Sequence, residues 1–252
     1  MEAYGAKPLV DVDHSIQGGG PRPEPRPSVR MNTGDVGILK CTLLPSLTLN
    51  TGLSLVSYAA ARATDRVEVK DYNWPASQVV NAWWSAIGRH MYHDHMPFTT
   101  AWNILPWTEK LLLSSVTLWG TRLFYRIVSR SVARGKDDPR YDELKEQQQQ
   151  QQQQGQGKGL SGFWNSALLK WFLPEAAVLT LVSLPFTLPF RMGSSTVSFA
   201  PQVSCGLRTL GVGLFSAGFA METLADAQLE SHSREGGGLC RRGVWSIVRH
   251  PK

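Results

Sequence analysis

The chain has 252 residues, with 26 Lys or Arg against 20 Asp or Glu, so its formal net charge is +6. Charged residues make up 18% of it, below the roughly 25% of an average soluble domain, and the apolar residues are concentrated in a few dense blocks. No nucleic-acid-binding motif accompanies the positive charge, so we expect no nucleic-acid partner. The cysteines, at wide and irregular spacing, predict neither a disulfide framework nor a zinc site: Cys41, Cys205 and Cys240.

The first 35 residues are rich in Pro and Gly. Their start lacks the basic and apolar stretches of a secretory signal, and its acidic residues do not fit a transit peptide. Prolines at every second position of 21–27 remove backbone donors and exclude helix and central strand. We therefore predict a disordered tail over residues 1–35 and a helical membrane domain over residues 36–252.

The segment 36–61 is the first candidate for a membrane helix. It consists mostly of apolar and small residues, interrupted by Lys40 and Pro45. At 1.5 Å per residue, it is about long enough to cross a hydrocarbon core of about 30 Å. Its many Ser and Thr residues leave a buried amphipathic helix as the alternative.

Residues 62–107 combine a charged stretch with a run of aromatic side chains. Rings at this density are typical of a membrane–water interface or of a ligand pocket. Within the run, His90, His93 and Asp94 have a spacing that could bring them to one face of a helix. No further Cys or His cluster completes a coordination sphere, so we favour a polar cap at the interface and predict no metal site.

A helix is predicted over residues 110–128, and it carries a row of cations. Arg122, Arg126 and Arg130 recur at every fourth position and therefore lie along one face of an otherwise apolar helix. Such a row is unfavourable in plain lipid. Two interpretations are open: the arginines extend to lipid headgroups, or they line a pocket for an anion.

Residues 135–162 contain a homopolymeric tract, Gln147–Gln154, beside a Gly-rich stretch. Low-complexity sequence of this kind does not favour a packed core. We therefore predict a Gln-rich cytosolic loop over this segment.

The two best candidates for membrane spans follow the Gln tract. Residues 172–190 are almost entirely apolar, and their prolines are better tolerated in a bundled membrane helix than in a soluble one. Residues 207–224 carry small side chains that let helices approach closely. We predict a hairpin that turns near 193–195. Because the flanks 122–136 and 234–252 are rich in Lys and Arg, they should face the cytosol.

An acidic row continues the second of these helices. Glu222, Asp226 and Glu230, followed by Arg234, fall on one line at steps of four residues. Like charges at this spacing repel, so the row requires a cation, a protonated carboxylate or arginines from elsewhere in the fold. A solvated helix end is the alternative.

The last residues combine glycines, arginines and a tryptophan. Arg241, Arg242 and Arg249 supply forked donors that suit phosphates, and Trp245 offers a flat face for a ring. These groups suit either a nucleotide cofactor or a lipid headgroup, although the spacing is that of neither a P-loop nor a Rossmann motif.

Two ordered motifs resemble the steroid 5-alpha-reductase-like family of polytopic membrane proteins. One is Glu222-x-x-x-Asp226-x-Gln228, followed by Gly243-x-Trp245-Ser246-x-x-Arg249-His250-Pro251. The other, Leu118 to Leu123 with Gly135 to Tyr141, is similar to segments of the uncharacterised branch of that family. The resemblance covers residues 110–146 and 163–251.

The resemblance implies an all-α fold, a polytopic helical bundle in the membrane of the endoplasmic reticulum. It further implies that the protein binds NADPH, whose hydride reduces a carbon–carbon double bond of a steroid or another lipid. Carried over position by position, it implies cofactor binding by Asp226, Gln228, Trp245, Arg249 and His250. It assigns no catalytic residue, and Tyr125 and Glu222 are candidates for a proton donor.

In the family the Arg-His-Pro element continues into Asn-Tyr and further helices, whereas this sequence ends at Lys252. We therefore expect a fragment whose bundle is incomplete at the C-terminus. The main hypothesis is a membrane oxidoreductase acting on CH–CH groups of a lipid or steroid substrate. The alternatives are a catalytically inactive membrane protein and a membrane methyltransferase, since such methyltransferases also use an Arg-His-Pro element.

Overall fold

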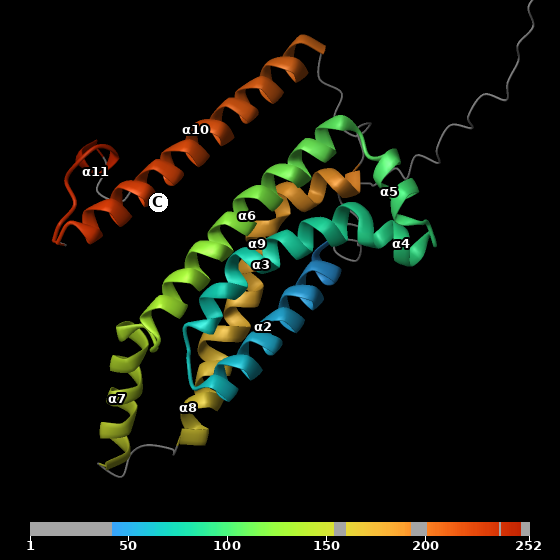
Figure 1. Ribbon diagram of the computed structural model, residues 1–252. Helices are drawn as coiled ribbons and strands as arrows, with labels where there is room; N and C mark the ends of the chain where they lie inside the picture. The colour runs from blue at the N-terminus through green and yellow to red at the C-terminus, as the bar shows by residue number, and fades with distance from the viewer. Residues whose placement is uncertain (1–41, 154–159, 193–200, 237, 248–252) are drawn as a thin grey trace, which may run out of the picture. The chain divides into compact units, whose positions relative to one another are not determined.

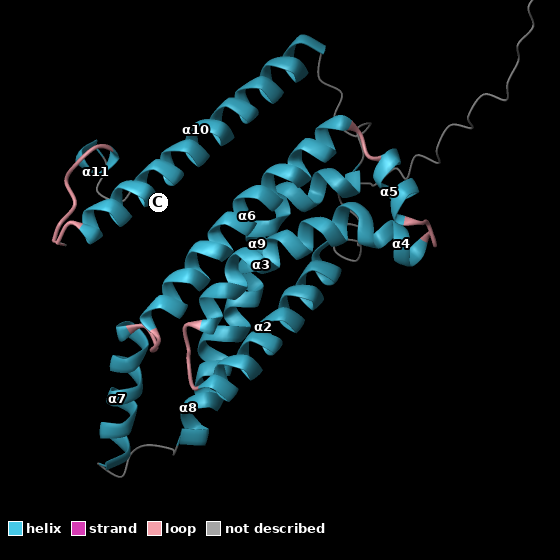
Figure 2. Ribbon diagram, viewed as in Figure 1, coloured by secondary structure: helices cyan, strands magenta, loops and turns pink. Residues whose placement is uncertain are grey.

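The computed structural model describes residues 42–153, 160–192, 201–236 and 238–247, and its regular elements are all helices (Figures 1 and 2). This confirms the expectation of an all-α fold. The expected tail at 1–35 and the expected hairpin turn at 193–195 lie outside the described residues.

Proline and residues with left-handed backbone mark the ends of the first helices. Helix α2 (Leu44–Thr64) has Pro45 in its first turn, where the missing N–H costs no hydrogen bond, and it ends at Asp65 with φ of 53°. Helix α3 (Val69–Trp83) runs directly into the π-helical turn η2 (Trp84–Gly88) and helix α4 (Arg89–His93). Helix α5 (Phe98–Ile104) follows a proline.

Helix α6 (Trp107–Arg134) contains the predicted segment 110–128 and begins after Pro106. It ends at Gly135, whose φ of 69° favours glycine and whose N–H donates to the Ser131 carbonyl. In the middle of α6, a Cβ added at Gly120 would lie 2.4 Å from Val79 Cγ2. Glycine at this position therefore allows α6 to approach α3 closely.

Helix α7 (Pro139–Gln153) occupies much of the segment for which a loop was expected, so the prediction of a loop over 135–162 is wrong for these residues. Proline suits the first position of a helix, and glutamine is a good helix former. The carboxylate of Asp138 accepts the backbone N–H of Arg140 at 3.1 Å and thereby caps the helix start. Whether the segment faces the cytosol stays a prediction.

Helix α8 (Leu160–Ala167), the π-helical turn η3 (Leu168–Phe172) and α9 (Leu173–Met192) follow one another without a break, and α10 (Pro201–Arg234) and α11 (Val244–Ile247) complete the chain. The predicted helices at 172–190 and 207–224 are therefore confirmed. Two prolines lie inside α9, where hydroxyls of Ser183 and Thr187 donate to backbone carbonyls and supplement the helical hydrogen bonds.

By length and apolar composition, one of the described helices could cross a membrane, the continuous stretch Gly162–Arg191. The expectation of a polytopic helical bundle is therefore not confirmed by helix length and composition.

Helices α2, α3 and α9 pack against one another, and α6 packs against α3 (Figure 1). An apolar cluster at each end of α9 contributes to this core. One includes Phe172 with residues of α2 and α8, and the other includes Phe190 with Leu113 and residues of α3 and α5. Between the clusters the helices bury polar side chains instead, among them Asn50, Ser54, Gln78, Asn81, Thr180 and Ser183.

Candidate functional site

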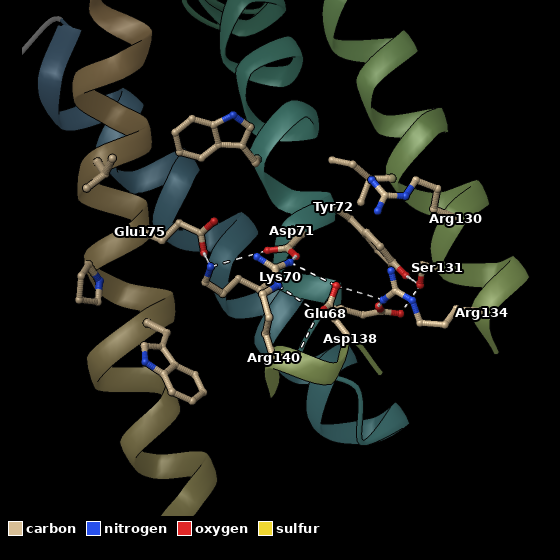
Figure 3. A pocket seen from close by; sticks show the side chains of 15 residues that line it. Glu68, Lys70, Asp71, Tyr72, Arg130, Ser131, Arg134, Asp138, Arg140 and Glu175 are labelled. Atoms are coloured by element: carbon tan, nitrogen blue, oxygen red, sulfur yellow. Dashed lines mark hydrogen bonds and ion pairs between the residues drawn. The ribbon is translucent and has the colours of Figure 1, made fainter. Parts of the chain in front are cut away.

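A charged cavity of about 610 Å³ lies between α3, α6, the start of α7 and α9 (Figure 3). Four cationic and four anionic side chains line it, together with the indole rings of Trp74 and Trp171. The charged residues are Lys70, Arg130, Arg134, Arg140, Glu68, Asp71, Asp138 and Glu175. We name it the charged cavity.

Seven of these eight charges form one chain of alternating sign across the cavity wall. Glu175 of α9 is 3.5 Å from Lys70 of α3, and Lys70 is 3.9 Å from Asp71. Arg140 of α7 lies 3.6 Å from Asp71 and 3.0 Å from Asp138. The chain thus links α9, α3 and α7 through their side chains.

Glu68 ends this chain at the α6 side. Arg134 donates to it at 2.8 Å and to Asp138 at 3.2 Å. The buried carboxylate of Glu68 also accepts hydrogen bonds from Arg66 and Ser131, and the Ser131 hydroxyl is in turn bonded to Tyr72. Because each carboxylate has cationic partners, the cavity wall is preorganised by its own charges.

The turn between α6 and α7 attaches this wall to the start of α3. Asp137 accepts the backbone N–H groups of Val67 at 2.8 Å and Glu68 at 3.0 Å, next to the first turn of α3. Lys145 lies 3.2 Å from the same carboxylate. The segment Gly135 to Tyr141, which the sequence analysis placed in a loop and in a motif of resemblance, therefore has a structural role that spacing alone did not reveal.

Two groups of this turn have shifted acidities. A hydrogen bond from Arg140 is the main cause that lowers the pKa of Asp138. Burial raises the pKa of Tyr141, and the adjacent Asp71 carboxylate, which accepts a hydrogen bond from its phenol at 3.0 Å, raises it further. Around neutral pH, Asp138 is therefore ionised and Tyr141 is neutral.

The four arginines of α6 form a row, Arg122, Arg126, Arg130 and Arg134, which we name the arginine row. With 3.6 residues per turn, positions four residues apart are rotated by about 40° around the helix axis. The row therefore winds around α6 from one neighbour to another. Its first two members contact α10, whereas its last two line the charged cavity.

The first two arginines bind the acidic row of α10, Glu222, Asp226 and Glu230. Arg122 is 2.8 Å from Glu222 and 2.6 Å from Asp226. Arg126 is 3.2 Å from both Asp226 and Glu230. The sequence analysis required a cation, a protonated carboxylate or arginines from elsewhere, and the structure supplies the arginines. The anions that these arginines bind are the protein's own carboxylates.

Arg130 differs from the other members of the arginine row. Its side chain is exposed and lines the charged cavity, and it makes no ion pair with a carboxylate of the described residues. Its charge is therefore available to a ligand in the cavity. The sequence does not show that Arg130 differs from Arg122 and Arg126, because the positions of α10 and α7 decide which arginines form ion pairs with carboxylates.

The structure brings together three of the five residues implied as a cofactor site. The side-chain oxygen Oε1 of Gln228 accepts the backbone N–H of Val244 at 3.0 Å, and the Trp245 indole donates to the backbone carbonyl of Ala225 at 2.9 Å. Asp226 lies between these groups along α10 and is buried. These bonds fold α11 back onto the end of α10. Arg249 and His250 lie outside the described residues.

The two candidate proton donors occupy different environments. Glu222 is ion-paired with Arg122, and Tyr125 is exposed on α6. Neither lines the charged cavity. Their suggested role stays a prediction.

The histidine segment forms a local hydrogen bond. His90 and Asp94 are joined at 2.7 Å, and this bond is the main cause that lowers the pKa of Asp94. Among the described residues, no group of three or more His, Cys, Asp or Glu is placed to hold a metal ion. Nearby, the rings of Trp83, Phe98 and Trp102 stack on one another.

A family model described as a protein of unknown function (DUF1295) matches residues 57–252. No curated protein and no solved structure matches the chain. The matched range includes the charged cavity, the arginine row and the acidic row. The chain therefore belongs to the DUF1295 family.

Proposed function

We propose that this protein is a polytopic membrane protein. The arrangement of its helix faces supports this, because between the two apolar clusters polar side chains lie inside the bundle and large apolar ones lie outside. Asn50, Thr180 and Ser183 are buried, while Leu181 is 63% exposed and Val182 is also exposed. Soluble proteins show the opposite arrangement. In lipid, hydrogen bonds between helices hold a bundle together, and apolar side chains face the acyl chains.

Within that membrane protein, we propose an NADPH-dependent oxidoreductase that reduces a carbon–carbon double bond of a lipid or steroid. The carrying observation is the charged cavity with Arg130 available in its wall. Ligand pockets typically measure about 300–1,000 Å³, so a volume of about 610 Å³ suits a cofactor of this size. The resemblance of the C-terminal and α6–α7 motifs to steroid 5-alpha reductases supports the same class.

The residues of the cavity fit the parts of NADPH. Arg130 and the exposed Arg140 would bind its phosphates, because guanidinium groups match phosphate oxygens in a forked geometry. The indoles of Trp74 and Trp171 offer faces for its rings. The proposed second part of the site consists of the residues implied by the resemblance, Asp226, Gln228, Trp245, Arg249 and His250. When bound, the nicotinamide supplies the hydride, and the protein supplies position and charge.

The proposed location follows from the same charges. The cavity lies beside the last turns of α6, within the basic flank 122–136. Basic flanks of membrane helices are retained on the cytosolic side. We therefore place the cavity at the cytosolic face of the endoplasmic reticulum, where it would be accessible to soluble NADPH.

Cofactor titrations of purified wild type and an Arg130→Ala variant, in detergent or lipid nanodiscs, test this function. Loss of a charge-assisted hydrogen bond of about 1.5–3 kcal/mol predicts an affinity for NADPH that is about 10- to 100-fold weaker. Arg62→Ala is the matched control, because Arg62 is an exposed arginine of α2 outside the cavity. It should bind NADPH as the wild type does.

Other outcomes would redirect the assignment. Binding of S-adenosylmethionine in place of NADPH would support the methyltransferase alternative. Binding of neither would support a catalytically inactive membrane protein. NADPH binding that is unaffected in Arg130→Ala would remove the cofactor from the charged cavity and leave the Gln228 and Trp245 region as its site.

A further inference from the structure

Three buried carboxamides lie in the interior between the two apolar clusters. Asn50 of α2 and Gln78 and Asn81 of α3 are at most 1% exposed. Asn50 donates to the Thr180 hydroxyl at 2.9 Å. Gln78 donates to the Leu179 carbonyl at 3.3 Å and Asn81 to the Ser183 hydroxyl at 2.9 Å. All three are thus anchored to about one turn of α9, and we name this set the carboxamide layer.

The orientation of each carboxamide is fixed by the hydrogens of α9. The Thr180 hydroxyl donates its hydrogen to the Ala176 carbonyl at 2.8 Å, and the Ser183 hydroxyl donates to the Thr180 carbonyl at 2.7 Å. Both hydroxyl oxygens are therefore acceptors toward α3 and α2, and the Leu179 carbonyl can only accept. Each carboxamide must present its NH₂ group to α9, which directs its oxygen away.

The three carboxamide oxygens, Asn50 Oδ1, Gln78 Oε1 and Asn81 Oδ1, accept no hydrogen bond from the described residues. A buried carbonyl without a donor is costly, and buried polar groups in folded proteins almost always have partners. A single buried oxygen without a hydrogen-bond donor would only lower the stability of the fold. Three such oxygens, on carboxamides that all bond to one turn of α9, indicate a shared partner that donates hydrogen bonds.

This partner must reach the carboxamide layer, which lies between two clusters of buried apolar side chains. Phe172 of one apolar cluster, at the end of η3, precedes the layer, and Phe190 of the other cluster, in α9, follows it. The nearest carboxylate toward the N-terminus of α9, Glu175, is paired with Lys70 in the charged cavity. The contacts of the layer itself are made by neutral groups.

We propose that the carboxamide layer is a binding site for internal water molecules. A water molecule donates two hydrogen bonds, which suits the carboxamide oxygens, and accepts two, which suits the second N–H of the same side chains. A bare monovalent cation would serve the oxygens alone and would be repelled by the amide hydrogens. Without a carboxylate in the layer, its burial would also be uncompensated.

Radiolytic hydroxyl-radical labelling tests this site, because bound water that is ionised by X-rays modifies the side chains beside it. In the intact protein in nanodiscs, we expect Leu179, which is 0% exposed and lies in the layer, to be modified several-fold faster than Leu113. Leu113 is the matched control, a leucine that is 1% exposed and lies in an apolar cluster. Equal, low labelling of the two leucines would overturn the proposal.

A variant tests whether the carboxamides bind the water, and a salt series distinguishes water from a cation. Asn81→Leu removes one carboxamide and should slow the labelling of Leu179 while leaving that of Leu113 unchanged. The wild-type comparison of the two leucines decides the question if this variant does not fold. A thermal midpoint that rises with Na⁺ but not with choline at equal ionic strength would overturn bound water in favour of a cation.

Discussion

Asp226 has an ion-pairing role in the structure that its motif did not suggest. The resemblance implied a cofactor contact, which stays a prediction, and the structure adds that the residue is 4% exposed and lies against two arginines of α6. A buried carboxylate between two guanidinium groups is already neutralised by them, and it is the one carboxylate of the acidic row that contacts both arginines. Asp226 therefore holds α10 beside α6, and any cofactor contact would be made in addition to that role.

Tyr141 permits a prediction about pH at the same scale. Its pKa is raised by burial and by Asp71. A raised pKa in the folded state means that the contribution of this contact to stability is complete below the pKa of an unfolded tyrosine, about 10, and is lost as the pH rises through the folded value. The contact between α7 and α3 should therefore weaken only under strongly alkaline conditions.

An ultraviolet titration of tyrosinate absorbance checks this sign. Tyr141→Phe should leave the amplitude of the step near pH 10 unchanged and remove amplitude only at higher pH. Tyr125→Phe is the control for the loss of one tyrosine, because Tyr125 is exposed. If Tyr141→Phe reduced the ordinary step, the buried environment of Tyr141 would be wrong.

At the scale of elements, the sequence predicted α6, α9 and α10 because their apolar blocks are long. It predicted the acidic row and most of the arginine row as separate features. It did not predict their pairing, because which faces of two helices meet depends on packing between distant segments. Helix α7 was missed for a related reason, since Tyr141 and Lys145 attach it to the α2–α3 region through long-range contacts.

The fold of α11 onto α10 depends on one glycine. Gly243 has φ of 58°, and a Cβ added to it would lie 2.4 Å from Gln228 Nε2. Gly243→Ala should therefore strain the backbone and displace Gln228 from Val244. Because Cys240 is only 8% exposed in this turn, we expect its alkylation by a maleimide to accelerate.

The chain contains its own controls for that experiment. Cys205 is exposed and should react at the same rate in wild type and variant. Gly211→Ala on α10 should leave both rates unchanged, since nothing lies within 4 Å of its added Cβ. An unchanged rate at Cys240 in Gly243→Ala would show that α11 does not need this glycine.

At the scale of the whole molecule, the described bundle has a polar interior between its two apolar clusters and large apolar side chains on its exterior. This was not evident from the sequence, because Asn50, Gln78 and Asn81 individually resemble surface residues of soluble helices. Only their burial together, opposite the hydroxyls of α9, reveals the pattern. Mean composition also concealed it, since the Ser and Thr residues of 36–61 weakened that segment as a candidate span.

The exposed apolar face of α9 leads to a prediction about membrane insertion. Leu181→Arg would place a charge on the apolar face of α9, at a cost of about 2.5–3.5 kcal/mol near the centre of a membrane helix. We expect less protein in the membrane fraction that resists alkaline extraction. Leu144→Arg on α7, outside the proposed spans, should insert normally. A Leu181→Arg protein that is folded and stable in water without detergent would contradict the membrane assignment.

The pairing of α6 with α10 has a further consequence for how the two helices are aligned. Both charged rows repeat every four residues, so sliding α10 by four residues, about 6 Å, would give Arg122 the carboxylates of Asp226 and Glu230. Arg126, however, would then face Glu230 and the like charge of Arg234, so the charged rows themselves favour the observed alignment. A second mark of this alignment is aromatic: Phe219 lies under the Arg122 guanidinium, at 5.5 Å from ring centroid to carbon. The residue four positions further along is Thr223, which has no ring. The contact between Phe219 and Arg122 can therefore form in only one of the two alignments.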